Sequence, residues 1–126
     1  MTAAELSTIV QENLKINIAV INNGYLGMVR QWQEFFYERN YEATPLVSPD
    51  FVKLADAHSI AGRAVRTRAE LADAVNQARN HNGPFLLNFM VEKEDSVYPM
   101  IPAGSALHEM IRRPGKNPLV ETADDK

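Results

Sequence analysis

Short apolar runs, separated by segments with helical spacing, constrain the fold of this chain more than any other feature. The clearest runs are residues 16–21 (Ile-Asn-Ile-Ala-Val-Ile) and residues 85–91, and a shorter candidate is residues 64–66. Each suits a strand but is too short for a helix, and strands that are apolar along most of their length are typical of parallel sheets. Strands that alternate with helices indicate a parallel sheet covered by helices on both faces. We therefore expect an α/β fold with a mainly parallel sheet between two helical layers.

Helix start signals divide the rest of the chain. Thr2 with Glu5 and Thr67 with Glu70 have the spacing of a capping box, and the Ser-Pro pair at 48–49 is a further start signal. Apolar residues recur at helical spacing after each of these signals. The expected helices cover residues 3–13, 27–38, 49–62 and 67–79, with one short helix at 105–112. We expect one domain over residues 1–97 and an extended tail over residues 98–126.

Composition excludes several classes of protein. The 126 residues carry a formal net charge of −3, which disfavours a nucleic-acid-binding protein, and they include no cysteine for disulfides or thiolate metal sites. No apolar run approaches the ~20 residues that cross a membrane. The first residues lack the positive region and apolar core of a signal peptide. We expect a cytoplasmic protein with no nucleic-acid or membrane partner.

The tetrapeptide Asn22-Asn23-Gly24-Tyr25 is the strongest candidate for a functional site. It follows the first expected strand and precedes a helix, and ligands of open α/β sheets bind at the carboxyl ends of strands. A side-chain amide oxygen and free turn carbonyls are suitable ligands for Mg²⁺, and a helix N-terminus favours phosphate. Taken alone, the tetrapeptide is more often a plain turn than a ligand site.

Longer strings reveal a family resemblance. Residues 21–37 (Ile-Asn-Asn-Gly-Tyr-Leu-Gly-Met-Val-Arg-Gln-Trp-Gln-Glu-Phe-Phe-Tyr) closely resemble the cofactor-binding segment of the acetolactate synthase catalytic subunit. Residues 49–55 (Pro-Asp-Phe-Val-Lys-Leu-Ala) resemble the next helix of that family, and residues 97–104 (Val-Tyr-Pro-Met-Ile-Pro-Ala-Gly) resemble its C-terminal tail. The likeness spans nearly the whole chain. It implies the thiamine-diphosphate-binding fold, with thiamine diphosphate and Mg²⁺ as cofactors.

The resemblance also implies roles for individual residues. The side chain of Asn23 and the backbone carbonyl of Tyr25 match ligands of the family's Mg²⁺. Trp32, together with Val29, matches residues that shape the pocket for a second 2-oxo acid. Met28 matches a methionine that packs against the cofactor. The expected cofactor-binding residues are Asn23, Gly24, Tyr25, Leu26, Gly27 and Met28.

Other parts of the family pattern are missing from this sequence. The family's third Mg²⁺ ligand is an aspartate in a Gly-Asp-Gly-like turn upstream of the asparagine pair, and too few residues precede Asn22 to include it. The strand before that turn is missing too, so we expect a truncated fold. The glutamate that activates the cofactor belongs to a pyrimidine-binding domain of a second subunit, and FAD belongs to a middle domain. We expect the chain alone to be an inactive fragment of a homodimer or larger assembly.

Three functions remain open at this point. The resemblance favours acetolactate synthase, which joins pyruvate to a second 2-oxo acid in branched-chain amino-acid synthesis. Another thiamine-diphosphate enzyme, such as a pyruvate oxidase or a glyoxylate carboligase, is the first alternative. The second is a non-catalytic fragment that only dimerises. By spacing alone, Met28, Trp32 and Phe36 on one helix face indicate core or interface more often than a pocket.

Overall fold

Three parallel strands form the sheet of the computed structural model, which describes residues 3–114. The strands are β1 (Asn17–Asn22), β2 (Ala61–Val65) and β3 (Phe85–Met90), and their order in the sheet is β1-β3-β2. β3 pairs in parallel with both neighbours, so that Asn88 lies between Val20 and Ala64. The structure confirms the expected α/β class with a parallel sheet.

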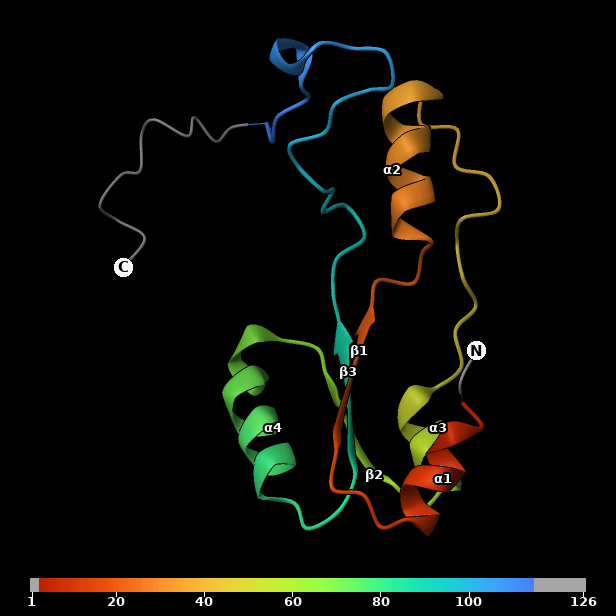
Figure 1. Ribbon diagram of the computed structural model, residues 1–126, viewed down its shortest axis with the longest axis vertical. Coiled ribbons are helices and arrows are strands. Elements are labelled where there is room, and N and C mark those ends of the chain that lie inside the picture. Colours follow the sequence, from red (N-terminus) through yellow and green to blue (C-terminus); the bar gives the residue numbers. More distant parts are fainter. Residues whose placement is uncertain (1–2, 115–126) are drawn as a thin grey trace, which may run out of the picture. The chain divides into compact units, whose positions relative to one another are not determined.

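Helices cover both faces of this sheet. α4 (Arg68–Asn80) lies on one face, and α1 (Glu5–Gln11) and α3 (Phe51–Ala57) lie on the other, while α2 (Gly27–Phe36) lies beyond the carboxyl ends of the strands (Figure 1). The order of the elements explains the layers, because the β1-to-β2 connection and the β2-to-β3 connection pass on opposite faces. The turn between β1 and α2 therefore lies at the edge of the sheet where ligands bind in such folds.

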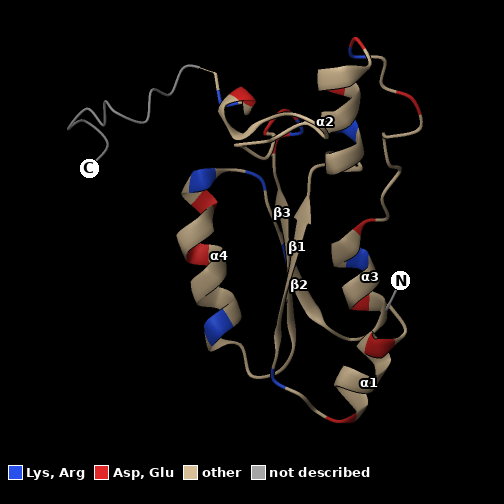
Figure 2. Ribbon diagram, turned by 45° about the horizontal axis from the view of Figure 1, so that its top comes forward, with Lys and Arg blue, Asp and Glu red and all other residues tan. Residues whose placement is uncertain are grey.

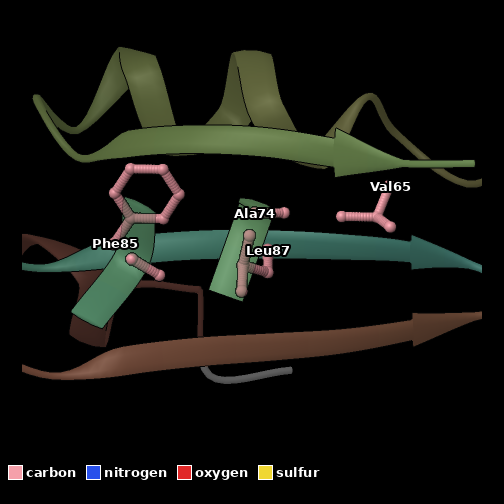
Figure 3. Close-up of a cluster of buried hydrophobic side chains, with 5 residues drawn as sticks. Val65, Ala74, Phe85 and Leu87 are labelled. Atoms are coloured by element: carbon pink, nitrogen blue, oxygen red, sulfur yellow. The ribbon is translucent and has the colours of Figure 1, made fainter. Parts of the chain in front are cut away.

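The core consists of two apolar clusters, one on each face. Phe85 and Leu87 of β3 point toward Ala74 of α4 and Val65 of β2 (Figure 3), and all four are at least 95% buried because their exposed fractions are 2%, 5%, 0% and 5%. Leu86 of β3 faces the opposite way, toward Ile60, Ala55 and Leu6. This division follows from the two-residue period of a strand, which places successive side chains on opposite faces.

The α3–β2 region differs from the sequence-based expectation at both ends of the helix. α3 begins at Phe51 rather than at Pro49, because the Asp50 carboxylate caps it by accepting hydrogen bonds from the Val52 and Lys53 amides at 3.0 and 3.1 Å. α3 also ends at Ala57, well before residue 62. Ser59 adopts a left-handed conformation there, with φ +62°, and the chain then continues into β2. β2 consequently covers Ala61–Val65 instead of residues 64–66.

Three other helices are shorter than expected. α2 ends at Phe36 because Glu38 and Arg39 adopt positive φ values of 51° and 61°. α1 starts after Ala4, which makes no side-chain cap, and the proposed cap residue Thr2 lies outside the described residues. The expected helix over 105–112 is reduced to a single 3₁₀ turn, Leu107–Glu109.

The chain divides into two compact units. The first ends at Glu94 and the second begins at Asp95, three residues before the expected boundary after residue 97. Within the second unit, Met100 and Ile111 form an antiparallel bridge, and Arg113 pairs with Asp95 at 2.6 Å. Among the described residues, no helix is long and apolar enough to span a membrane.

The capping box of α4 is present as the sequence predicts, and it leads to a pH-dependent contribution to stability. The Glu70 carboxylate accepts hydrogen bonds from the Arg66 and Thr67 amides at 2.8 and 3.3 Å. The Arg66 hydrogen bond is the largest cause that lowers the pKa of Glu70 below its ordinary value. Acidic and basic residues are interspersed along the rest of α4 (Figure 2).

We expect the Glu70→Gln variant to lose part of the acid sensitivity of the chain. A lowered pKa means that the stabilisation is complete above the ordinary glutamate pKa of about 4.3 and disappears as the pH falls through the lowered value. Thermal melting of both proteins between about pH 6 and pH 3 checks this. The melting temperatures should differ most at the higher pH and converge at the lower pH, and parallel curves would contradict the expectation.

Candidate cofactor-binding turn

The 22–26 turn joins β1 to α2, and its own side chains shape it. Asn22 Oδ1 accepts a hydrogen bond from the Gly24 amide at 3.1 Å, and Asn23 Oδ1 accepts one from the Tyr25 amide at 3.0 Å. Both are Asx turns, which asparagine forms because its short amide reaches the backbone two residues on. Gly24 adopts φ +68°, a conformation that an L side chain rarely takes. The Asn-Asn-Gly order therefore encodes the turn locally.

A second segment, residues 44–46, pairs with this turn. The Leu26 amide donates to the Thr44 carbonyl at 2.9 Å, and the Leu46 amide donates to the Gly24 carbonyl at 2.8 Å. Tyr25 and Pro45 thereby form an antiparallel bridge. Thr44 is completely buried, with an exposed fraction of 0%. The sequence predicts only a loop for this region, so the pairing of residues 44–46 with the turn is a finding of the structure.

Gln33 of α2 holds this segment in place. Its Nε2 donates to the Glu42 carbonyl at 2.8 Å, and its Oε1 accepts from the Thr44 hydroxyl at 3.1 Å. Both polar atoms of the Gln33 side-chain amide therefore bond to the 41–46 segment, which includes the residues 44–46 that pair with the turn. Neither Gln33 nor Thr44 was singled out from the sequence, because glutamine and threonine carry no signal of their own at these positions.

The orientation of the Tyr25 carbonyl follows from this pairing. The Tyr25 carbonyl and the Leu26 amide belong to the same planar trans peptide group, so they point in opposite directions. Because the Leu26 amide points at Thr44, the Tyr25 carbonyl points away from the 44–46 segment. Within residues 3–114, this carbonyl accepts no backbone hydrogen bond. It is one of the two oxygens expected to bind Mg²⁺, and it is free to do so.

Gly27, the first residue of α2, leaves space for the other expected ligand. A Cβ atom at this position would lie 3.0 Å from Asn23 Nδ2, closer than side chains normally approach. Any larger residue would therefore displace the Asn23 amide. The glycine keeps that amide next to the start of the helix, where backbone amides and the helix dipole favour an anion.

The residues expected to contact cofactor and substrate share the exposed side of α2. Met28, Val29 and Trp32 have exposed fractions of 54%, 48% and 43%. Val29 and Trp32 line one hollow of about 410 Å³ with Gln33, Tyr37, Asn40 and Glu42. The Trp32 and Phe36 rings pack with centroids 5.2 Å apart. The structure brings Val29 and Trp32 together, and their role as a substrate pocket stays a prediction.

A second hollow, with both polar and apolar lining residues, lies over the carboxyl ends of the strands on the α3 side. It has a volume of about 580 Å³, and Asn22, Ser48, Asp50, Arg66 and Asn88 are among its lining residues. Asn88 is 7% exposed, and its Oδ1 atom is buried without a hydrogen-bond partner. Its Nδ2 atom contacts Met90 Sδ at 3.6 Å. From the sequence, residue 88 is recognisable only as part of an apolar strand, so this polar position is a finding of the structure.

The comparison with known protein families decides which family the turn belongs to. Residues 1–89 match the C-terminal TPP-binding domain of thiamine pyrophosphate enzymes. The chain belongs to this family. Thiamine pyrophosphate is the same molecule as thiamine diphosphate, so the match bears out the resemblance on which the cofactor was expected.

Individual relatives are consistent with this assignment. The mitochondrial acetolactate synthase of Schizosaccharomyces pombe is 41% identical over 111 residues, which are 88% of this chain and 17% of that protein. The acetolactate synthase of Mycobacterium leprae is 41% identical over 127 residues, with 96% of this chain and 20% of that protein covered. The chain thus spans about a fifth of the length of these relatives.

A solved structure confirms the fold. The thiamine diphosphate-dependent 4-hydroxybenzoylformate decarboxylase of Rhodococcus jostii RHA1 superposes with a TM-score of 0.66, covering 75% of this chain and 18% of that chain at 23% identity. At this identity the likeness concerns the fold only. The α/β architecture of the thiamine-diphosphate-binding domain is thereby supported independently of the sequence motifs.

The turn of this thiamine-diphosphate-binding domain fits part of a magnesium site. Asn23 and Tyr25 offer two oxygens, and Gly27 preserves the space beside Asn23. Across residues 3–114, no three acidic, histidine or cysteine side chains gather as metal ligands would. Mg²⁺ prefers an octahedron of hard oxygens that usually includes a carboxylate. The two oxygens that the turn offers, from Asn23 and Tyr25, are both neutral.

Proposed function

We propose that this chain supplies the turn that binds the Mg²⁺-diphosphate end of thiamine diphosphate in an acetolactate synthase. The observation that carries the proposal is the Tyr25 carbonyl, which accepts no backbone hydrogen bond among the described residues and shares its turn with Asn23 at the carboxyl edge of a parallel sheet. In this proposal, Asn23 and Tyr25 bind Mg²⁺, and residues 24–28 contact the cofactor. The bound cofactor supplies the carbanion chemistry, and the protein binds and orients it.

The proposed substrates are pyruvate and a second 2-oxo acid. Two observations support them: the acetolactate synthase relatives at 41% identity, and the hollow that Val29 and Trp32 line on the exposed side of α2. An aromatic wall and an aliphatic wall suit a small ligand with an apolar side chain. We also propose that the chain works in an assembly of subunits, since the apolar residues Met28, Val29 and Trp32 are too exposed for a surface in water.

A chimera tests this proposal. The chain replaces the matching segment of the Mycobacterium leprae acetolactate synthase, to which it aligns over 127 residues. We expect the chimera to form acetolactate from pyruvate only when Mg²⁺ and thiamine diphosphate are both present. Pyruvate consumption that instead requires an electron acceptor would favour an oxidase. A folded chimera that neither binds the cofactor nor consumes pyruvate would contradict the proposal.

Substitution of Asn23 identifies the turn as the binding element. We expect Asn23→Ala to reduce the affinity of the chimera for Mg²⁺ by about 100-fold or more, because few protein ligands hold this ion. Val47→Ala is the matched control, since Val47 lies close to the turn in sequence and its side chain is fully exposed. Calorimetric titration of Mg²⁺ with thiamine diphosphate measures both variants. Equal affinities in the two variants would mean that the turn does not bind the metal.

A further inference from the structure

Arg30 is the most buried charged side chain of the first unit, and its contacts converge on the cofactor turn. Its exposed fraction is 7%, and it lies in α2 next to the buried Gln31. Its guanidinium lies 4.6 Å from the ring centroid of Tyr41 and 5.6 Å from that of Tyr25. Burial of a cation is costly unless acceptors and aromatic faces compensate for the lost water. The residues around Arg30 therefore compensate for the burial of its charge.

Polar contacts hold the guanidinium between these rings. Nη1 donates to the Lys93 carbonyl at 3.0 Å and pairs with the Glu34 carboxylate at 3.2 Å. The Glu94 carboxylate lies 4.0 Å from Nη2. Arg30 thus connects α2 to the segment that follows β3, and it has a fixed position relative to the sheet. A fixed guanidinium can in turn restrict the two tyrosines that pack against it.

Both tyrosines belong to segments that hold the peptide group whose carbonyl is the proposed metal ligand. Tyr25 carries that carbonyl, and Tyr41 begins the 41–46 segment that contains Thr44. Thr44 accepts the hydrogen bond of the Leu26 amide, which orients the Tyr25–Leu26 peptide group. Lys93 Nζ also lies 5.3 Å from the Tyr25 ring, so two cations restrict this side chain.

We propose that Arg30 is a positioning residue for the Tyr25 carbonyl: it holds the rings of Tyr25 and Tyr41, and thereby the 22–26 turn and the 41–46 segment, in the orientation that binds the metal. The part that concerns the metal rests on the proposed function. The part that concerns the peptide group can be measured without any cofactor. Arg30 itself contacts neither the metal nor the substrate in this proposal.

Amide hydrogen exchange on the complete 126-residue chain provides the first test. The Leu26 amide belongs to the same peptide group as the Tyr25 carbonyl, so its exchange reports on that group directly. We expect Arg30→Met to accelerate the exchange of Leu26 and Leu46 by at least about tenfold, while Ile60 and Phe85 amides keep the rates of the unmodified chain. Arg30→Lys, which retains the charge, should restore part of the protection. Unchanged exchange at Leu26 in Arg30→Met would overturn the proposal.

The control for loss of an arginine as such is Arg63→Met. Arg63 belongs to β2, and its guanidinium pairs with Asp73 at 2.6 Å and with Gln77 at 3.0 Å, both of α4. The Arg63→Met variant should leave the exchange rate of the Leu26 amide unaltered. If both arginine variants accelerate every amide equally, Arg30 contributes to overall stability only and the proposal fails.

A double-mutant cycle in the chimera tests the link to the metal. We expect Arg30→Met and Tyr25→Leu each to weaken Mg²⁺ binding by about 10- to 100-fold, as residues that orient metal ligands do. The double variant should bind no more weakly than the weaker single variant, because Arg30 acts through the Tyr25 ring. Additive losses, or full affinity in Arg30→Met, would overturn the positioning role. A chimera that does not bind Mg²⁺ before any substitution would instead refute the proposed function, and the exchange experiment then decides alone about Arg30.

Discussion

We expect Gly27→Ala to weaken the binding of Mg²⁺ and thiamine diphosphate by at least about tenfold while leaving the fold intact. The added methyl group would lie 3.0 Å from Asn23 Nδ2, so the Asn23 amide has to shift by a few tenths of an ångström, which disturbs its geometry as a metal ligand. Alanine in a helix is otherwise more stable than glycine by up to about 1 kcal/mol. Affinity and stability should therefore change in opposite directions. Calorimetric titration of the chimera and thermal melting of the chain measure the two quantities.

Gly24→Ala is the control that separates a conformational cost from the steric cost expected at Gly27. No atom lies within 4 Å of a Cβ at Gly24, but φ is +68° there, so the cost is conformational. We expect the chain to lose about 1–2 kcal/mol of stability from that strain. If Gly27→Ala binds the cofactor as tightly as the unmodified chimera, the Asn23 amide can shift without consequence, and the steric argument is wrong.

Phe85→Ala should be the most destabilising single substitution in the core. Phe85 is 2% exposed at the start of the central strand β3, and it packs in the cluster between the sheet and α4 (Figure 3). Truncation of a buried phenylalanine costs about 3–5 kcal/mol, because the transfer free energy is lost and a cavity remains. A domain of this size is usually stable by only about 5–15 kcal/mol. Urea denaturation followed by circular dichroism should show a much lower midpoint.

Ile21→Ala provides the matched comparison on the same sheet. Ile21 is 67% exposed on the edge strand β1, and a surface truncation of this kind usually changes stability by about 0.5 kcal/mol or less. A large loss in this variant, comparable with that of Phe85→Ala, would mean that the exposed face of β1 is covered in solution. Equal midpoints for both variants and the unmodified chain would contradict the assignment of the core.

Local sequence features predicted much of the fold. The apolar runs identified β1 and β3 within one residue at each end, since a buried strand is recognisable from its own composition. The Thr67 and Glu70 capping box is present where the spacing predicts it. The sequence also located the 22–26 turn, because asparagine and glycine form such turns through their own side chain and backbone.

The predicted ends of α2 and α3 were wrong where a residue without a strong backbone preference takes an unusual conformation. Ser59 ends α3 with φ +62°, although glycine is the common signal for this position and Gly62 was taken as the stop. Asp50 caps α3 in place of the Ser-Pro pair, and Glu38 and Arg39 end α2 without any glycine. These choices depend on the packing of the whole element, which the local sequence does not contain.

The sequence by itself determined the α/β class, the position of the 22–26 turn and the family to which the chain belongs. Only the tertiary structure decided how the turn is held. The 41–46 segment pairs with the turn through Thr44, Gln33 secures that segment, and Arg30 connects both to the chain beyond β3. The physical reason is distance along the chain: a strand, a cap or an Asx turn forms between near neighbours, whereas the Arg30–Lys93 contact joins residues 63 positions apart.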